Sequence, residues 1–162
     1  MSTTRQLLLN TNNPIVAGNN TDLASLASNG VVLCASAGAF SNVKGDAAGQ
    51  GYPYCRAVLH LGAPGSAWTT GTAWYVWFLT EDDGSNYATA AATSGTSSTP
   101  PCSRAPDLIF PVENNTSAQV VTAECAVPDC AAIKTLVWNN AGQTSAASGN
   151  ALDLYFYTDQ LN

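Results

Sequence analysis

Charged residues are scarce in this sequence. Asp, Glu, Lys and Arg make up 10% of the 162 residues, whereas they are about 25% of a typical globular chain. Lysine and glutamate, which favour exposed helices, are nearly absent, and this shortage argues for β structure. Polarity comes instead from Ser, Thr, Asn and Gln, which suits a protein held in an assembly or working outside the cell.

The basic residues are too few and too scattered to bind nucleic acid. The net charge is −6, and the five basic residues are Arg5, Lys44, Arg56, Arg104 and Lys134. Neutralising a phosphate backbone requires clustered Lys and Arg, and so does binding to an anionic membrane surface. The sequence therefore predicts no nucleic-acid partner and no membrane partner.

Long apolar runs are also missing. No run in the sequence approaches the roughly 18 residues that a membrane-spanning helix requires. Near the N-terminus only Leu7, Leu8 and Leu9 stand together before Asn10, which does not make an ordinary signal peptide. We therefore expect the chain to be made, and first folded, in a cytosol.

Residues for catalysis or metal binding form no recognisable motif. His60 is the only histidine, and no Gly-x-Ser-x-Gly motif is present for a nucleophile. The acidic stretch at residues 81–86 has oxygen ligands for calcium but lacks the closing carboxylate, so a turn is the favoured interpretation. Glycoside hydrolysis needs two carboxylates at a defined distance, and nothing in the sequence fixes any pair of Glu81, Asp82, Glu113 and Glu124 at that distance. We predict no catalytic, cofactor-binding or metal-binding residues, and no cofactor.

Five cysteines are many for a chain that folds in a cytosol: Cys34, Cys55, Cys102, Cys125 and Cys130. Cys125 and Cys130 flank Val-Pro-Asp at residues 127–129, so a disulfide across a hairpin is geometrically feasible. The alternative is that cysteine serves as a small buried hydrophobe. Both interpretations stay open, and a zinc site is disfavoured because the Cys-x4-Cys spacing has no second pair.

The central feature of the sequence is a run of six large apolar or aromatic residues at positions 74–79. Its β-branched and aromatic content favours a strand over residues 73–80. Because no polar residue interrupts the run, both faces of this strand must be covered. We expect Trp74, Val76 and Phe78 to share one core with three leucines, Leu136, Leu152 and Leu154.

Further strands are predicted on both sides of this run, with no alternation of strands and helices. Residues 54–61 alternate in polarity and place His60 beside Arg56 on the more polar face. The other main strands are expected at residues 3–9, 31–36, 107–112, 118–126, 132–138 and 151–158. The length suits one domain, residues 1–162, and the pattern predicts an all-β fold, an antiparallel β-sandwich or jelly roll.

Two segments are hard to bury in a single domain. Residues 1–18 read as an N-terminal strand or arm, and residues 88–103 as an exposed loop or arm rich in Ser, Ala and Thr. We expect at least one of them to lie on a neighbouring subunit.

Four tryptophans raise the alternative of a sugar-binding module. Trp74, Trp77 and Trp138 lie in predicted strands, where packing in the core is the more frequent use. Trp68 lies in a turn rich in Gly, Pro, Ser and Thr and is expected to be exposed. It is therefore the candidate glycan platform.

The second half of the sequence contains a series of short motifs: Val76-Trp77-Phe78-Leu79, Asp83-Gly84-Ser85-Asn86-Tyr87, Arg104-Ala105-Pro106-Asp107-Leu108-Ile109-Phe110-Pro111, Lys134-Thr135-Leu136-Val137-Trp138-Asn139-Asn140, Gly142-Gln143, Ala147-Ser148-Gly149-Asn150 and Leu154-Tyr155-Phe156-Tyr157-Thr158-Asp159-Gln160. Through these motifs, residues 74–160 resemble small virion proteins of tailed bacteriophages. They are similar to head-decoration and other accessory structural subunits with β-sandwich folds.

The resemblance implies a virion component without catalysis that decorates or cements the capsid. The implied partners are the major capsid protein or other virion subunits, and a homo-oligomer is expected. The alternative from another class is a carbohydrate-binding β-sandwich, such as an adhesin of the tail, neck or baseplate, which would use Trp68.

Overall fold

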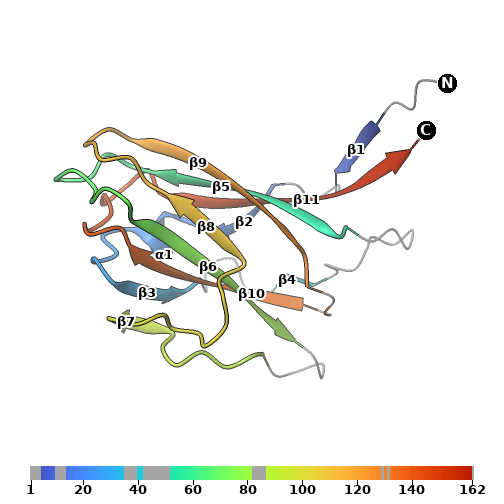
Figure 1. Ribbon diagram of the computed structural model, residues 1–162, viewed down its shortest axis with the longest axis horizontal. Helices are drawn as coiled ribbons and strands as arrows, with labels where there is room; N and C mark the ends of the chain where they lie inside the picture. Colours follow the sequence, from blue (N-terminus) through green and yellow to red (C-terminus); the bar gives the residue numbers. More distant parts are fainter. Residues whose placement is uncertain are drawn as a thin grey trace.

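The computed structural model describes residues 5–9, 14–34, 40–41, 52–81, 87–128, 130 and 132–161. This part of the chain is almost entirely β structure, with one short helix (Figure 1). The elements are β1 (Arg5–Leu9), β2 (Ile15–Gly18), α1 (Asn20–Leu23), β3 (Gly30–Leu33), β4 (Phe40–Ser41), β5 (Tyr54–Leu61), β6 (Ala73–Glu81), β7 (Ser94–Thr96), β8 (Leu108–Pro111), β9 (Gln119–Ala126), β10 (Ala132–Asn140) and β11 (Ala151–Leu161).

The strands form two antiparallel sheets packed against each other. We call them sheet A, with the order β1-β11-β5-β9 and β2 also paired with β11, and sheet B, with the order β7-β3-β10-β6-β8 and β4 paired with β10. The predicted antiparallel β-sandwich is confirmed. The jelly-roll form stays a prediction.

The centre of sheet B is the pair formed by β6 and β10, in which Val76 lies opposite Val137. Trp74, Val76 and Phe78 point from β6 into the core between the sheets, where Leu152 and Leu154 of β11 meet them. These five residues are each 0% exposed, and the prediction that they share one core is confirmed. Leu136 was wrongly placed with them, because alternation along β10 directs it to the opposite face of sheet B.

That opposite face carries a second apolar layer, made of Val31, Trp77, Leu79, Cys102, Leu136 and Trp138. The segments on either side of the edge strand β7, residues 87–93 and 97–107, run beneath this face of sheet B and cover it (Figure 1). Trp77 Nε1 donates to the Arg104 carbonyl at 3.1 Å, and Trp138 Nε1 donates to the Ser97 carbonyl at 3.2 Å. Both faces of β6 are thus buried, as predicted.

Residues 88–103 therefore differ from the expectation of a projecting arm. Most of residues 88–100 are exposed on their outer side, as expected. However, β7 pairs with β3, and the amide of Leu33 donates to the carbonyl of Thr93. Ala90 and Ala92 pack against the second apolar layer. Small side chains let this backbone lie close to the sheet, so the segment is a cover for its own domain.

A buried asparagine joins the loops at one end of the sandwich. Asn139 is 0% exposed, and its Nδ2 donates to the carbonyls of Leu26, Ala27 and Gln143 at 2.9, 3.1 and 2.8 Å. Its Oδ1 accepts from the amide of Ala141. Buried polar groups of loops destabilise the folded state unless they are hydrogen-bonded. The Asn139 side chain supplies hydrogen bonds to several of these loop groups.

The opposite end of the fold carries a two-stranded ribbon. β1 pairs with the C-terminal part of β11, from Leu9 opposite Tyr157 to Arg5 opposite Leu161. The pairing of β11 with β5 stops at Tyr157 opposite Tyr54. The ribbon consequently extends beyond the sandwich, with the blue β1 beside the red end of β11 (Figure 1). The predicted N-terminal strand is present, and we call this element the β1–β11 ribbon.

Candidate binding surface

The outer face of sheet A presents a regular array of side chains from three strands. Along β5, β9 and β11 alternate residues point away from the core, and all are exposed or half-buried. From the ribbon inward, the rows across the three strands are Tyr157-Tyr54-Ala126, Tyr155-Arg56-Glu124, Asp153-Val58-Thr122 and Ala151-His60-Val120. We call this array the sheet A face.

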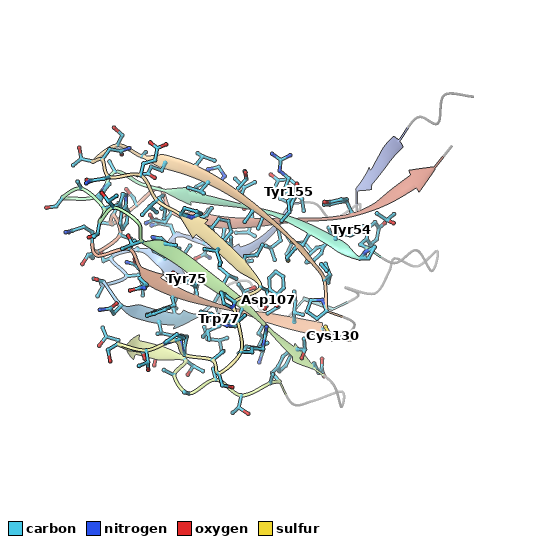
Figure 2. All side chains as sticks on the ribbon, viewed as in Figure 1. Tyr54, Tyr75, Trp77, Asp107, Cys130 and Tyr155 are labelled. Atoms are coloured by element: carbon cyan, nitrogen blue, oxygen red, sulfur yellow. The ribbon has the colours of Figure 1, made fainter. Side chains whose placement is uncertain are left out.

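The end of the sheet A face next to the ribbon is aromatic. The rings of Tyr54 and Tyr157 stack with centroids 5.5 Å apart and an interplanar angle of 28°. Tyr54 is 41% exposed, and Tyr155 lies on the same sheet (Figure 2). Stacked tyrosines with an exposed ring offer both an apolar surface and hydroxyl groups to a partner.

The remainder of the sheet A face is polar. His60 Nε2 lies 3.4 Å from Asp153 Oδ2, with the histidine side chain 41% exposed. Arg56 lies between Tyr155 and Glu124 in the register of the sheet. The expectation that His60 and Arg56 share the more polar face is confirmed. Among the described residues, His60 has a carboxylate partner but no hydrogen bond to a serine, threonine or cysteine.

Trp68 is not part of this surface. It is 1% exposed and packs edge-on against Trp74, with ring centroids 6.1 Å apart and an interplanar angle of 78°. The amides of Trp68 and Thr69 donate to the carbonyls of Asn115 and Ala141, so the turn folds back over the core. The expectation of an exposed Trp68 is therefore wrong: the large apolar ring determined its position, not the polar composition of its neighbours.

Of the acidic residues considered for calcium binding or catalysis, the described ones, Glu81, Glu113 and Glu124, lie in different parts of the fold. Residues 82–86 of the acidic turn lie outside the described residues, and Glu81 accepts a hydrogen bond from the Tyr87 hydroxyl at 3.4 Å. Glu113 accepts from the Asn115 side chain, whereas Glu124 lies on the sheet A face. Within the described ranges, no group of three His, Cys, Asp or Glu side chains could hold a metal ion.

Arg104 and Asp107, which belong to one of the resemblance motifs, complete the edge of β6 beyond the end of β8. The Phe78 amide donates to Asp107 Oδ2 at 2.7 Å, and Arg104 Nη2 donates to the Phe78 carbonyl at 2.7 Å. Arg104 Nη1 lies 2.9 Å from both Asp107 carboxylate oxygens. Their role is structural, because they hydrogen-bond a strand edge that would otherwise stay open.

None of the five cysteines is in a disulfide bond in the structure. Cys130 lies in the core between the sheets, at the turn from β9 to β10 (Figure 2). Cys125 lies directly opposite Cys55 across β9 and β5. The pKa of the Cys55 thiol is raised, first by a hydrogen bond with the Cys125 thiol and to a smaller extent by burial. A Cys125–Cys130 disulfide stays a prediction, but sequence reasoning missed that Cys55 faces Cys125.

Comparison with protein-family models, curated proteins and solved structures finds no match for this chain. In the part of the chain that the structure describes, no helix has the length and apolarity to cross a membrane.

Proposed function

We propose that this chain is a structural subunit of a bacteriophage virion, which decorates or cements the capsid by contacts with neighbouring subunits. The observation that carries the proposal is the β1–β11 ribbon, which extends beyond the body of the sandwich. The resemblance of residues 74–160 to decoration subunits supports the same role, as does the low content of charged residues.

The ribbon is suited to subunit contact because it is an incomplete sheet. Among the described strands, β1 pairs only with β11, and residues 158–161 of β11 pair only with β1. A two-stranded ribbon is marginally stable alone in water, and its free edges present backbone N–H and C=O groups. Pairing with a strand of another subunit would satisfy these groups. The proposed partners are the major capsid protein and further copies of this chain in a homo-oligomer.

Substitution of Thr158 tests the role of the ribbon. Thr158 lies opposite Leu8 and beyond the last pair with β5. Proline there removes a backbone N–H and is poorly tolerated in a paired strand, whereas Thr158→Ala keeps the backbone and serves as the matched control. The measurement is occupancy on capsids assembled from the major capsid protein of the same genome, together with the melting temperature of the free protein.

We expect Thr158→Pro to lower the affinity for the capsid by about 5- to 150-fold, and occupancy at limiting protein accordingly, since lost backbone hydrogen bonds cost roughly 1–3 kcal/mol. Thr158→Ala should bind like the unaltered protein. Ser98→Lys, on the exposed side of residues 88–103, should also bind normally because that segment lies on its own sheet. Full occupancy of Thr158→Pro would refute the role of the ribbon.

The alternative function, a carbohydrate-binding β-sandwich, is favoured by the tyrosine pair on the sheet A face. Tyr54 and Tyr157 provide the exposed aromatic surface that the buried Trp68 cannot. A glycan array probed with the isolated protein tests it: binding that is lost in Tyr54→Ala and kept in Thr158→Pro would favour this function. Absence of binding on the array would leave the virion role ahead.

A further inference from the structure

Cys55 and Cys125 occupy directly opposed positions on neighbouring antiparallel strands. Cys55 of β5 pairs in register with Cys125 of β9. Both side chains point toward the core, because residues 55, 57, 59 and 61 of β5 and residues 119, 121, 123 and 125 of β9 form the inner sides of the two strands. Opposed residues have Cα atoms about 4.5–5.5 Å apart, within the roughly 4.4–6.8 Å that a disulfide spans.

The two thiols are also close enough to interact directly. Interaction with the Cys125 thiol, more than burial, raises the pKa of the Cys55 thiol. The Cys130 thiol donates to the carbonyl of Pro128 at 3.4 Å. Cys102 belongs to the second apolar layer on the far side of sheet B. Of the five cysteines, Cys55 is the one that lies in register opposite Cys125.

We propose that Cys55 and Cys125 form a cross-strand disulfide when the folded protein meets an oxidising environment. This inference is independent of the virion role. The oxidant is a small disulfide such as oxidised glutathione. In the first step a Cys125 thiolate attacks one sulfur of the oxidant, forming a mixed disulfide and releasing one reduced glutathione. In the second step the Cys55 sulfur attacks Cys125, giving the protein disulfide and a second reduced glutathione. The two protein thiol protons end on the two released thiols.

The difference in exposure sets the order of these steps. Cys55 is 0% exposed, so a soluble oxidant cannot reach it first. Cys125 is half-buried near the end of an edge strand. The raised pKa of the Cys55 thiol makes the second step slow, because the thiolate is the attacking species.

The bond would tie β9 to the rest of sheet A. β9 is the last strand in the order β1-β11-β5-β9, and its hydrogen bonds within the sheet are all to β5. The bridge joins residues 70 positions apart (125 − 55), so it closes a long loop of the unfolded chain. A bridge between Cys125 and Cys130 would close a loop of only five positions (130 − 125), which has a much smaller entropic effect.

Peptide mapping of the intact native protein tests the pairing directly. The folded protein is incubated with oxidised glutathione and then denatured in the presence of excess alkylating reagent, which also blocks free thiols that were buried. The chain is digested without reduction. Trypsin places Cys55 in the peptide 45–56, and Cys125 together with Cys130 in the peptide 105–134. A second protease that cuts before Asp129 separates Cys125 from Cys130. The expected product links the Cys55 peptide to the fragment 107–128, which contains Cys125.

Thermal unfolding provides the second measurement. Oxidation should raise the melting temperature by roughly 5–15 °C, and a reductant should reverse the shift. Cys125→Ala should abolish the shift, whereas Cys130→Ala and Cys102→Ala should keep it. A link between Cys125 and Cys130, or a protein whose Cys55 and Cys125 are both blocked as free thiols after prolonged incubation, would overturn the proposal.

Discussion

Trp138 should hold the covering segment onto sheet B, and replacing it should open that segment before the rest of the fold. Trp138 is 5% exposed, and its ring lies 5.4 Å from that of Tyr75 and 6.4 Å from that of Trp77. Its Nε1 donates to the Ser97 carbonyl next to β7. The side chain thus joins the second apolar layer to the segment that covers it.

Two substitutions separate these contributions. Trp138→Phe keeps an aromatic ring but removes the hydrogen bond to Ser97, which costs about 1 kcal/mol. Trp138→Ala also removes the buried ring, and the free energy of unfolding should fall by roughly 3–5 kcal/mol. That is a large part of the roughly 5–15 kcal/mol that stabilises a domain.

Hydrogen exchange measured by mass spectrometry distinguishes local opening from general loss of stability. In Trp138→Phe, exchange of the amides at residues 94–97 should accelerate about fivefold, which corresponds to about 1 kcal/mol in the local opening equilibrium. Amides of β5 and β11 in sheet A should keep their rates. Val137→Ala is the control, because Val137 points from the same strand into the core between the sheets.

The reasoning is refuted if Trp138→Phe leaves exchange at residues 94–97 unchanged. It is equally refuted if exchange accelerates by the same factor in both sheets, because the segment would then open only with the whole domain. Val137→Ala should instead affect both sheets together.

Three further predictions concern stability. Phe78→Ala should lower the free energy of unfolding by about 3–5 kcal/mol. Ile109→Ala is the control, because this site is 48% exposed and the change should be less than about 1 kcal/mol. Equal shifts of the urea midpoint in the two variants would contradict the buried position of Phe78. Asp107→Ala should lower the free energy of unfolding by about 2–4 kcal/mol, because it leaves the Phe78 amide without its acceptor and Arg104 without its carboxylate partner. A circular-dichroism melt that matches the unaltered protein would contradict the role of this pair. Asn139→Ala should lower the free energy of unfolding by about 2–4 kcal/mol, since the loop carbonyls that Asn139 pairs lose their donor. Proteolysis of the loop at residues 141–149 should also accelerate. An unchanged cleavage rate would contradict this role of Asn139.

The central strand could be predicted from the sequence because one local property defines it. Six consecutive apolar residues leave no polar face, so burial on both sides follows without knowledge of neighbouring strands. The predicted range, residues 73–80, differs by one residue from the observed β6, Ala73–Glu81. The alternation along β5 likewise placed His60 and Arg56 on the correct face.

What covers β6 could not be predicted, because it depends on the tertiary structure. Residues 88–103 have few large apolar side chains, and that composition is typical of a solvent-exposed loop. They cover β6 through backbone hydrogen bonds and through alanines that let their backbone lie close to sheet B. Neither feature has a sequence signature. Trp68 was misjudged for the same reason, since its polar neighbours indicate a turn but not the direction in which the ring points.

The candidate surface and the cysteine pair depend on strand order, which the sequence does not reveal. Tyr54 and Tyr157 are more than a hundred positions apart, and they stack because β5 and β11 are neighbours. Cys55 and Cys125 meet because β5 also pairs with β9. The spacing of Cys125 and Cys130 was visible in the sequence, but a short spacing does not show which sulfur faces which.

The place of β11 in the middle of sheet A has a consequence for biosynthesis. β11 is the last described strand to leave the ribosome, yet it joins β1 and β2 on one side to β5 on the other. Sheet B lacks this dependence, because all its strands precede residue 141. A nascent chain can therefore assemble sheet B while β1, β2 and β5 still lack β11, their shared neighbour. A stop codon between residues 141 and 151 would leave such a half-sandwich permanently, and the product should aggregate or be degraded instead of accumulating as a shorter folded protein.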